Sequence, residues 1–171
     1  MTRNLAIGLG LGLGLFAAAS AVGAAAPQAS PPPPAPPARS EAYTPAATID
    51  ARMATIGANG VAVLDVPSDP GIRFSSLRRD RDGEVEVHGL ANEHIYILEG
   101  VLDYEAGGTV SGARATAPNE WRGGQIAGGR RYTLRPGDAM FIPAGTPHRI
   151  RLGEGVAHVR YIGVKNNSPQ N

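Results

Sequence analysis

The chain from Val61 to Val164 is a series of short β-type runs separated by turns that contain glycine and proline. The runs cover Val61 to Val66, Ile72 to Arg79, Glu84 to His88, His94 to Leu98, Val101 to Glu105, Arg130 to Leu134, Ala139 to Ile142, His148 to Leu152 and Val156 to Val164. Many short strands separated by turns predict an all-β sandwich or barrel. No long helical period interrupts the runs, which argues against a doubly wound α/β sheet.

One segment before these runs has a helical period. Ile49, Met53 and Ile56 fall on one stripe of a helix, and Thr48 is placed to cap it. A glycine follows directly. The sequence therefore predicts a short helix from Thr44 to Ile56 that packs on the outside of the β domain.

Met1 to Ala26 has the pattern of a secretory signal peptide. A single positive charge, Arg3, precedes an apolar centre from Leu5 to Phe16, and alanines at 24–26 form an A-x-A-like cleavage site. The run from Leu5 to Ala26 is also just long enough to span a bilayer, so an uncleaved anchor is the alternative. We expect a periplasmic or secreted protein without a membrane partner after cleavage.

Residues 27–37 contain seven of the fifteen prolines. Such a stretch lacks amide donors and large apolar groups, so it cannot fold alone. We predict a stiff, disordered linker over residues 27–40. Residues 41–171 remain for a single domain, which is a usual size for a domain with its own core.

Charge and cysteine content exclude several classes of function. Removal of the leader takes away only Arg3, so Lys plus Arg falls from 16 to 15, against 15 Asp plus Glu. A nearly neutral chain argues against nucleic acid and against an anionic membrane surface as partners. The chain has no cysteine. Disulfides and thiolate sites are therefore excluded, and a metal would need histidine, carboxylate, carbonyl or water ligands.

Two segments have spacings that resemble known motifs. The later one follows G-x5-P-x-G-x2-H, with Gly137, Pro143, Gly145 and His148 at the fixed positions. It resembles the second cupin motif, with Leu152 in place of the usual terminal asparagine. The earlier one resembles the first cupin motif, H-x-H-x3-4-E-x6-G, with His88, Glu93 and Gly100 at its last three positions. Glu86 stands where the first histidine is expected.

The resemblance implies the cupin double-stranded β-helix, a jelly-roll barrel whose conserved part covers about residues 72–164. It also implies a homodimer of such barrels. Both implications concern the fold more than any particular reaction.

Strand alternation tests which side chains would enter the barrel. In His148 to Leu152, the two arginines would face water, so His148 would face inward. In Glu84 to His88, either the valines or the polar residues can be buried. A lone strand favours buried valines, whereas the cupin resemblance directs Glu86 and His88 into the lumen, with the valines against the helix or a second subunit.

Buried imidazoles and a carboxylate are costly without a partner, and a divalent cation removes that cost. We therefore predict His88, Glu93 and His148 as metal ligands, a two-histidine, one-carboxylate set. Glu86 would be a fourth ligand or would orient His88. Fe, Mn or Zn would fit. His94 should face the opposite side from Glu93, and a surface or interface position is expected for His158.

The segment from Ala106 to Arg135, between the motifs, is predicted to be a flap near one barrel mouth or a dimer contact. It contains Trp121, which would either stack on a ligand or anchor the loop by packing. Tyr96 and Phe141 are predicted to be core or lumen residues that line a ligand pocket.

Together these features predict an exported cupin with a divalent metal in its lumen and a small polar or carboxylate-type ligand. Such a protein could be a metal-dependent oxygenase or isomerase. One alternative is a non-catalytic ligand-binding or sensing module of the periplasm. A second is a metal-free structural cupin that works as a dimer.

Overall fold

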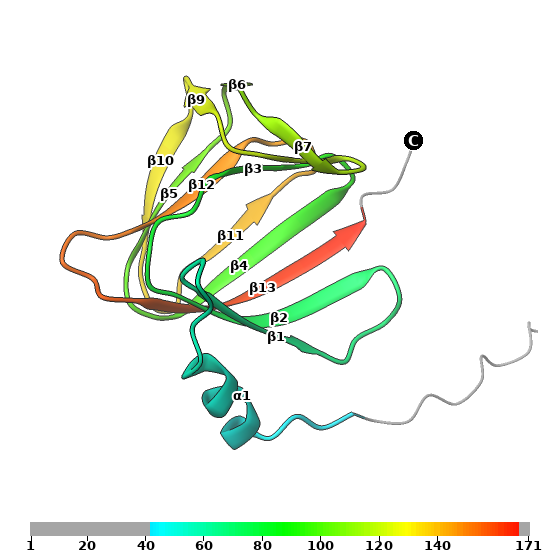
Figure 1. The fold of residues 1–171 in the computed structure, drawn as a ribbon, viewed down its shortest axis with the longest axis vertical. Helices are drawn as coiled ribbons and strands as arrows, with labels where there is room; N and C mark the ends of the chain where they lie inside the picture. The colour runs from blue at the N-terminus through cyan, green and yellow to red at the C-terminus, as the bar shows by residue number, and fades with distance from the viewer. Residues whose placement is uncertain (1–41, 168–171) are drawn as a thin grey trace, which may run out of the picture. The chain divides into compact units, whose positions relative to one another are not determined.

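The computed structural model describes residues 42–167 (Figure 1). The predicted signal peptide and proline-rich linker lie outside the described residues. Within the described range, the chain forms one helix, α1 (Ala46–Met53), and thirteen β-strands. None of the helical structure there is long and apolar enough to cross a membrane.

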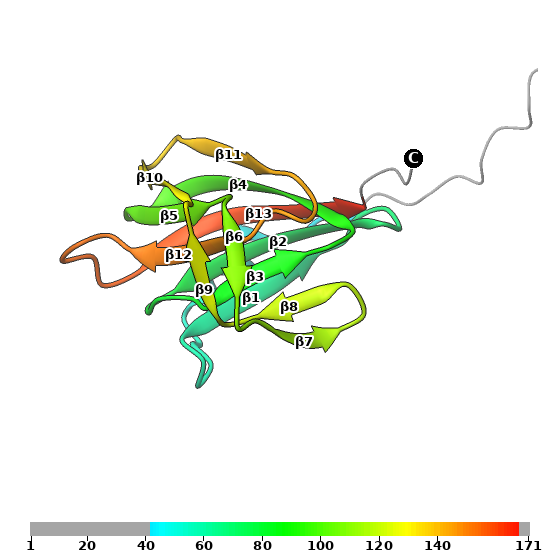
Figure 2. The same ribbon diagram turned by 90° about the horizontal axis from the view of Figure 1, so that it is seen from above.

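Two antiparallel sheets make up most of the domain, one of five strands and one of six. The first has the order β1 (Val61–Val66), β2 (Ile72–Arg79), β13 (Val159–Asn167), β4 (Ala91–Glu99) and β11 (Ala139–Ile142). The second has the order β10 (Arg130–Leu134), β5 (Leu102–Ala106), β12 (His148–Leu152), β3 (Val85–His88), β8 (Glu120–Arg122) and β7 (Arg114–Ala117). Buried residues of both sheets form a single apolar cluster. The sheets therefore enclose a common interior (Figure 2), and the predicted all-β jelly-roll class is confirmed.

The long segment between the two motifs is folded into strands. β7 and β8 form a hairpin, and β8 pairs with β3 at the edge of the six-stranded sheet. Asn119 takes a positive φ of 59° in the hairpin turn, a conformation that asparagine tolerates better than most residues. β6 (Thr109–Ser111) and β9 (Gln125–Ala127) make a further two-stranded sheet (Figure 1). Part of the expected flap is thus an extension of the barrel wall.

The interior changes from apolar to polar along the barrel. The inward positions, taken in this direction, are Leu152, Ile150 and His148 on β12, Ile97, Ile95 and Glu93 on β4, and Tyr161, Gly163 and Lys165 on β13. Full burial of one large aliphatic side chain contributes about 1.5–3 kcal/mol. The apolar end can therefore hold the two sheets together, which leaves the polar end available for a site.

Strand β3 has both of its faces covered. Glu86 and His88 face the interior, as the resemblance to the first cupin motif predicted. Val85 and Val87 are buried on the opposite face. The expectation that α1 covers these valines is wrong, because α1 packs against β1 and β2. Trp121 of β8 lies in register with Val87 instead.

Helix α1 is shorter than predicted. Pro45 occupies its N-cap with an extended backbone (φ −61°, ψ 144°), so Thr48 lies inside the helix and does not cap it. Proline has no backbone N–H to donate and is tolerated only at the start of a helix, which explains the boundary. Met53 is the buried residue of the helix, and Arg160 binds Asp50 at 2.9 Å. These contacts fix α1 on the barrel.

Candidate metal site in the barrel lumen

The two motif segments meet at the polar end of the barrel. β11, which opens the second motif, pairs with β4, so that Ile142 lies opposite Glu93. The loop that follows turns at Gly145, whose φ is 78°, and the Gly145 amide donates to the carbonyl of His88 at 2.8 Å. Glycine adopts this conformation without strain. The loop therefore delivers His148 to a position beside His88, although sixty residues of chain separate the two.

Both histidines are held with the same ring nitrogen directed into the lumen. His88 and His148 are each only 2% exposed, and their ring centroids are 5.2 Å apart. His88 Nδ1 lies 2.6 Å from Glu120 Oε2, and His148 Nδ1 lies 2.9 Å from the carbonyl of Thr146. Because each partner is an acceptor, each Nδ1 carries the proton and donates it. The lone pair of each Nε2 is then available for a cation.

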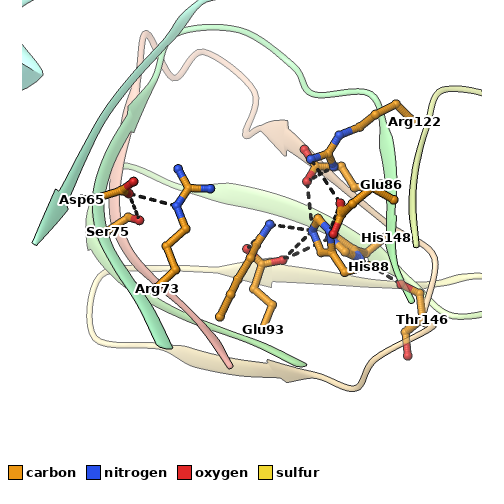
Figure 3. Close-up of polar contacts among 11 residues, drawn as sticks. Asp65, Arg73, Ser75, Glu86, His88, Glu93, Arg122, Thr146 and His148 are labelled. Carbon is orange, nitrogen blue, oxygen red and sulfur yellow. Dashed lines mark hydrogen bonds and ion pairs between the residues drawn. The ribbon is translucent and has the colours of Figure 1, made fainter. Parts of the chain in front are cut away.

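Two carboxylates approach these Nε2 atoms. Glu93 Oε2 is 3.2 Å from His148 Nε2 and 3.7 Å from His88 Nε2. Glu86 Oε2 is 3.3 Å from His88 Nε2. Figure 3 shows the four side chains pointing toward one another. Ligand atoms of Glu86, His88 and His148 all lie within 4.8 Å of one another, a spacing at which they could hold a metal ion.

The cluster consists almost entirely of hydrogen-bond acceptors. With its proton on Nδ1, His148 has no donor facing Glu93, and its Nε2 has no hydrogen-bond partner among the described residues. Buried acceptors that face one another are unfavourable unless a cation or a proton lies between them. This donor set suits Fe, Mn or Zn, which accept imidazole and carboxylate ligands.

Two cations also reach the cluster. Arg122 forms an ion pair with Glu86. Lys165 Nζ lies 2.7 Å from His88 Nε2 and 3.9 Å from Glu93 Oε1. The ammonium of Lys165 therefore occupies the side of His88 from which a metal would bind.

Both inward carboxylates are ionised. Burial by itself raises the pKa of Glu86, but the positive charges of Arg122 and Lys165 work against burial, and the net pKa lies well below the ordinary value. Burial likewise raises the pKa of Glu93, the positive charge of Lys165 opposes burial, and the net shift is downward. Ionised carboxylates are the form that binds a metal.

The ring of Tyr104 packs against the ring of His148. Their rings are stacked at 5.8 Å with planes 8° apart. Burial raises the pKa of Tyr104 well above its ordinary value, with smaller contributions from Glu93 and Glu86. The phenol therefore stays neutral.

A cavity of about 330 Å³ opens beside the cluster. Glu86, Glu93 and His148 form part of its wall, together with side chains from β1, β2 and β13. Arg73, which Figure 3 shows to one side of the cluster with Asp65, is among them. This size suits a small molecule.

Three residues predicted to line a ligand pocket lie away from the cluster. Tyr96 and Phe141 are 47% and 53% exposed and sit on the outer face of β4 and β11, so the expected core or lumen position is wrong. Both line a separate cavity of about 330 Å³ on that face, so a ligand pocket at these two residues stays a prediction. Because Glu93 and Ile142 face inward, strand alternation sends Tyr96 and Phe141 outward. Trp121 shares the outer face of its sheet with Val87 and packs near Gly89, which agrees with an anchoring role.

The remaining histidines are also outside the lumen. His94 is exposed and lies against Phe141, with ring centroids 4.8 Å apart. His158 Nε2 lies 2.9 Å from Glu99 Oε1 near the surface. Both positions agree with the sequence prediction.

Sequence reasoning missed three residues of the site: Glu120, Arg122 and Lys165. Glu120 and Arg122 alternate around Trp121, a pattern that places both on one face of a strand. No local signal connects that strand to β3. Lys165 lies beyond the last predicted run, and only the register of β13 with β4 sets it opposite Glu93.

Comparison with known proteins gives structural neighbours only. No family model matches the chain, and no curated protein matches its sequence. "FeII HppE" is 15% identical, with a TM-score of 0.48 over 61% of this chain and 49% of that one. TT1209 from Thermus thermophilus is 21% identical, with a TM-score of 0.49 over 70% and 94%. A cupin superfamily protein from Desulfitobacterium hafniense is 16% identical, with a TM-score of 0.44 over 64% and 80%.

The chain thus spans about half the length of the first of these structures. At such identity the chemistry of a neighbour does not transfer to this chain, so the site is argued from its own geometry. The two-sheet barrel, with both motif segments meeting at its polar end, is a cupin-type jelly roll. It contains a candidate His/Glu metal site.

Proposed function

We propose that this protein binds a divalent metal in the barrel lumen through His88, His148 and Glu93, with Glu86 as a fourth ligand. The observation that carries the proposal is that each histidine Nδ1 faces an acceptor while each Nε2 faces a carboxylate, an arrangement in which Nδ1 holds the proton and Nε2 is free to bind. Metal binding requires this protonation state of each residue.

Glu120 would orient His88 and increase its basicity. A carboxylate that accepts the distal N–H of a ligating histidine fixes the ring and strengthens the ligand. Glu86 was expected either to bind the metal or to orient His88. Glu120 contacts Nδ1 of His88, whereas Glu86 lies near Nε2. We therefore propose that Glu86 binds the metal.

The cavity would admit a small polar or carboxylate-type ligand to the metal. When bound, a metal in this setting supplies Lewis acidity or, if it is iron, a site for oxygen chemistry. The protein's own residues would exclude bulk water and orient the ligand. A metal-dependent oxygenase or isomerase is therefore our leading candidate for activity, and a non-catalytic binding module is the alternative.

A metal-free protein is a second candidate, and Lys165 is the observation in its favour. The ammonium already contacts His88 and approaches Glu93, and Arg122 neutralises Glu86. Two built-in cations can thus offset two buried carboxylates without a metal.

Elemental analysis of protein purified without added metal separates these candidates. The leading proposal predicts close to stoichiometric Fe, Mn or Zn and a lower melting temperature after chelation. His88→Ala and His148→Ala should each lose the metal. His94→Ala and His158→Ala, which change the two outer histidines, are matched controls and should retain it.

Absence of bound metal, together with a melting temperature unaffected by chelator and by added metal, would favour the metal-free candidate. For a metal-loaded protein, oxygen uptake and isomerisation assays with small carboxylates then distinguish an enzyme from a binding module. Binding without turnover would support the module.

A further inference from the structure

Four cationic side chains line the cavity: Arg73, Arg79, Arg122 and Lys165. Three of them have a carboxylate nearby. Arg73 pairs with Asp65 at 3.0 Å, Arg122 pairs with Glu86, and Lys165 lies 3.9 Å from Glu93. Within residues 42–167, no acidic side chain forms an ion pair with Arg79, and its Nε has no hydrogen-bond partner.

Arg79 is nevertheless buried, with 8% of its surface exposed. Its guanidinium interacts with the hydroxyl of Tyr161, which cannot serve as a counter-ion, because burial raises the pKa of Tyr161 to about 12. Arginine is rarely buried unless it is paired. The cavity therefore has a cationic end whose charge is not offset by an ion pair in the described part of the protein.

The acidic residues that share this end of the cavity are engaged elsewhere. Asp82 Oδ1 accepts the amide of Leu152 at 3.0 Å. Glu84 forms a two-pronged ion pair with Arg114, at 2.8 and 3.2 Å. Neither carboxylate is directed at Arg79, so an anion from outside would not have to displace one.

The guanidinium of Arg79 packs closely against Gly83. A Cβ added at Gly83 would lie 3.0 Å from Arg79 Nη1 and 3.4 Å from the Ile150 carbonyl. Arg79 Nη1 is thus near the backbone of Ile150, which lies two residues from His148 on the same inward face of β12. Two residues of strand correspond to about 7 Å.

We propose that Arg79 is an anion-binding subsite of the cavity and that the ligand places a carboxylate on its guanidinium. The planar guanidinium can hold a carboxylate through two parallel hydrogen bonds, which lysine and neutral residues cannot do. A short dicarboxylate, or a carboxylate with a second oxygen group, would then reach both Arg79 and the histidine cluster. The position of that second group rests on the proposed function, whereas the Arg79 subsite does not require a metal.

Calorimetric titration with succinate and glutarate tests the subsite, in both chelator-treated and metal-loaded protein. Succinamide is the uncharged control ligand. Wild-type protein should bind the dicarboxylates and not succinamide, and Arg79→Met should weaken binding by about tenfold or more. Arg73→Met is the matched control, since it removes a cavity arginine that already has a carboxylate partner. It should change affinity by less than about threefold.

Arg79→Gln serves as a second variant if Arg79→Met does not fold. If neither folds, Gly83→Ala takes their place, because its new methyl group would crowd Nη1, and it should weaken succinate binding by about threefold or more. No dicarboxylate binding to wild type, equal binding by the Arg79 variants, or an equal loss in Arg73→Met would each overturn the subsite.

The experiment also keeps this proposal separate from the proposed function. Arg79→Met should retain the metal content of wild type, because Arg79 contacts none of the candidate ligands. Metal without Arg79-dependent binding would remove the subsite and leave the metal site. Arg79-dependent binding in a protein that takes up no metal would remove the metal site and leave the subsite.

Discussion

Glu120 Oε2 lies 2.6 Å from Nδ1 of His88, although 32 residues separate them in the sequence. This contact decides which nitrogen of His88 faces the lumen. It also gives the segment between the two motifs a direct part in the candidate site, since the β7–β8 hairpin supplies the carboxylate.

Glu120→Ala should weaken metal binding by about 10- to 100-fold, because His88 loses the acceptor that fixes its tautomer and ring orientation. Competition titration against a metal-sensitive dye measures the change. Glu99→Ala is the matched control, since Glu99 makes a similar contact with His158 at 2.9 Å near the surface. Equal metal affinity in the two variants would contradict the role of Glu120.

Lys165→Met should increase metal affinity by about tenfold, because it removes a cation that competes for His88 Nε2 and makes the cluster more negative by one charge. The metal-free variant should be less stable than wild type by about 1–3 kcal/mol, because the carboxylates lose a counter-charge. Titration and urea denaturation give the two values. If stability falls and no metal binds, Lys165 is the internal cation of a metal-free protein.

The stability of the metal-free protein should depend on the ionisation of Glu86. Its pKa lies below the ordinary value of 4.5 in the folded state. The stabilising contribution is therefore fully present above pH 4.5 and is lost as the pH falls below it. The difference in urea midpoint between wild type and Glu86→Gln should shrink across that range. A difference that stays constant down to acid pH would show that charge at Glu86 does not stabilise the fold.

Two substitutions of Tyr104 should have very different effects. Its hydroxyl is buried, with no hydrogen-bond partner in the described part of the chain, so Tyr104→Phe should change stability by less than about 1 kcal/mol. Tyr104→Ala removes the ring stacked on His148 and should cost about 3–5 kcal/mol. Thermal or chemical denaturation of both variants checks the prediction. A large loss in Tyr104→Phe would contradict the expectation that the hydroxyl contributes little to stability.

The sequence predicted best the positions of residues that belong to the same motif or the same strand. His88 and Glu93 lie on strands that follow each other in the sequence, β3 and β4, one in each sheet. The Pro-x-Gly spacing before His148 predicts a rigid loop. Strand alternation also placed His94 outside. The same alternation, counted from Glu93, puts Tyr96 outside as well, so a core or lumen position for Tyr96 conflicts with the phase of its own strand.

The sequence by itself determined the β class of the domain, the two motif segments and the inward direction of His148, because these follow from local residue chemistry and a two-residue repeat. Only the tertiary structure decided that Glu120 and Arg122 join His88 and Glu86, that Lys165 lies among them, and that Arg79 is buried without an acidic partner in the described residues. Those contacts depend on the register between strands distant in the sequence. That register is set by packing across the whole barrel and has no local signal.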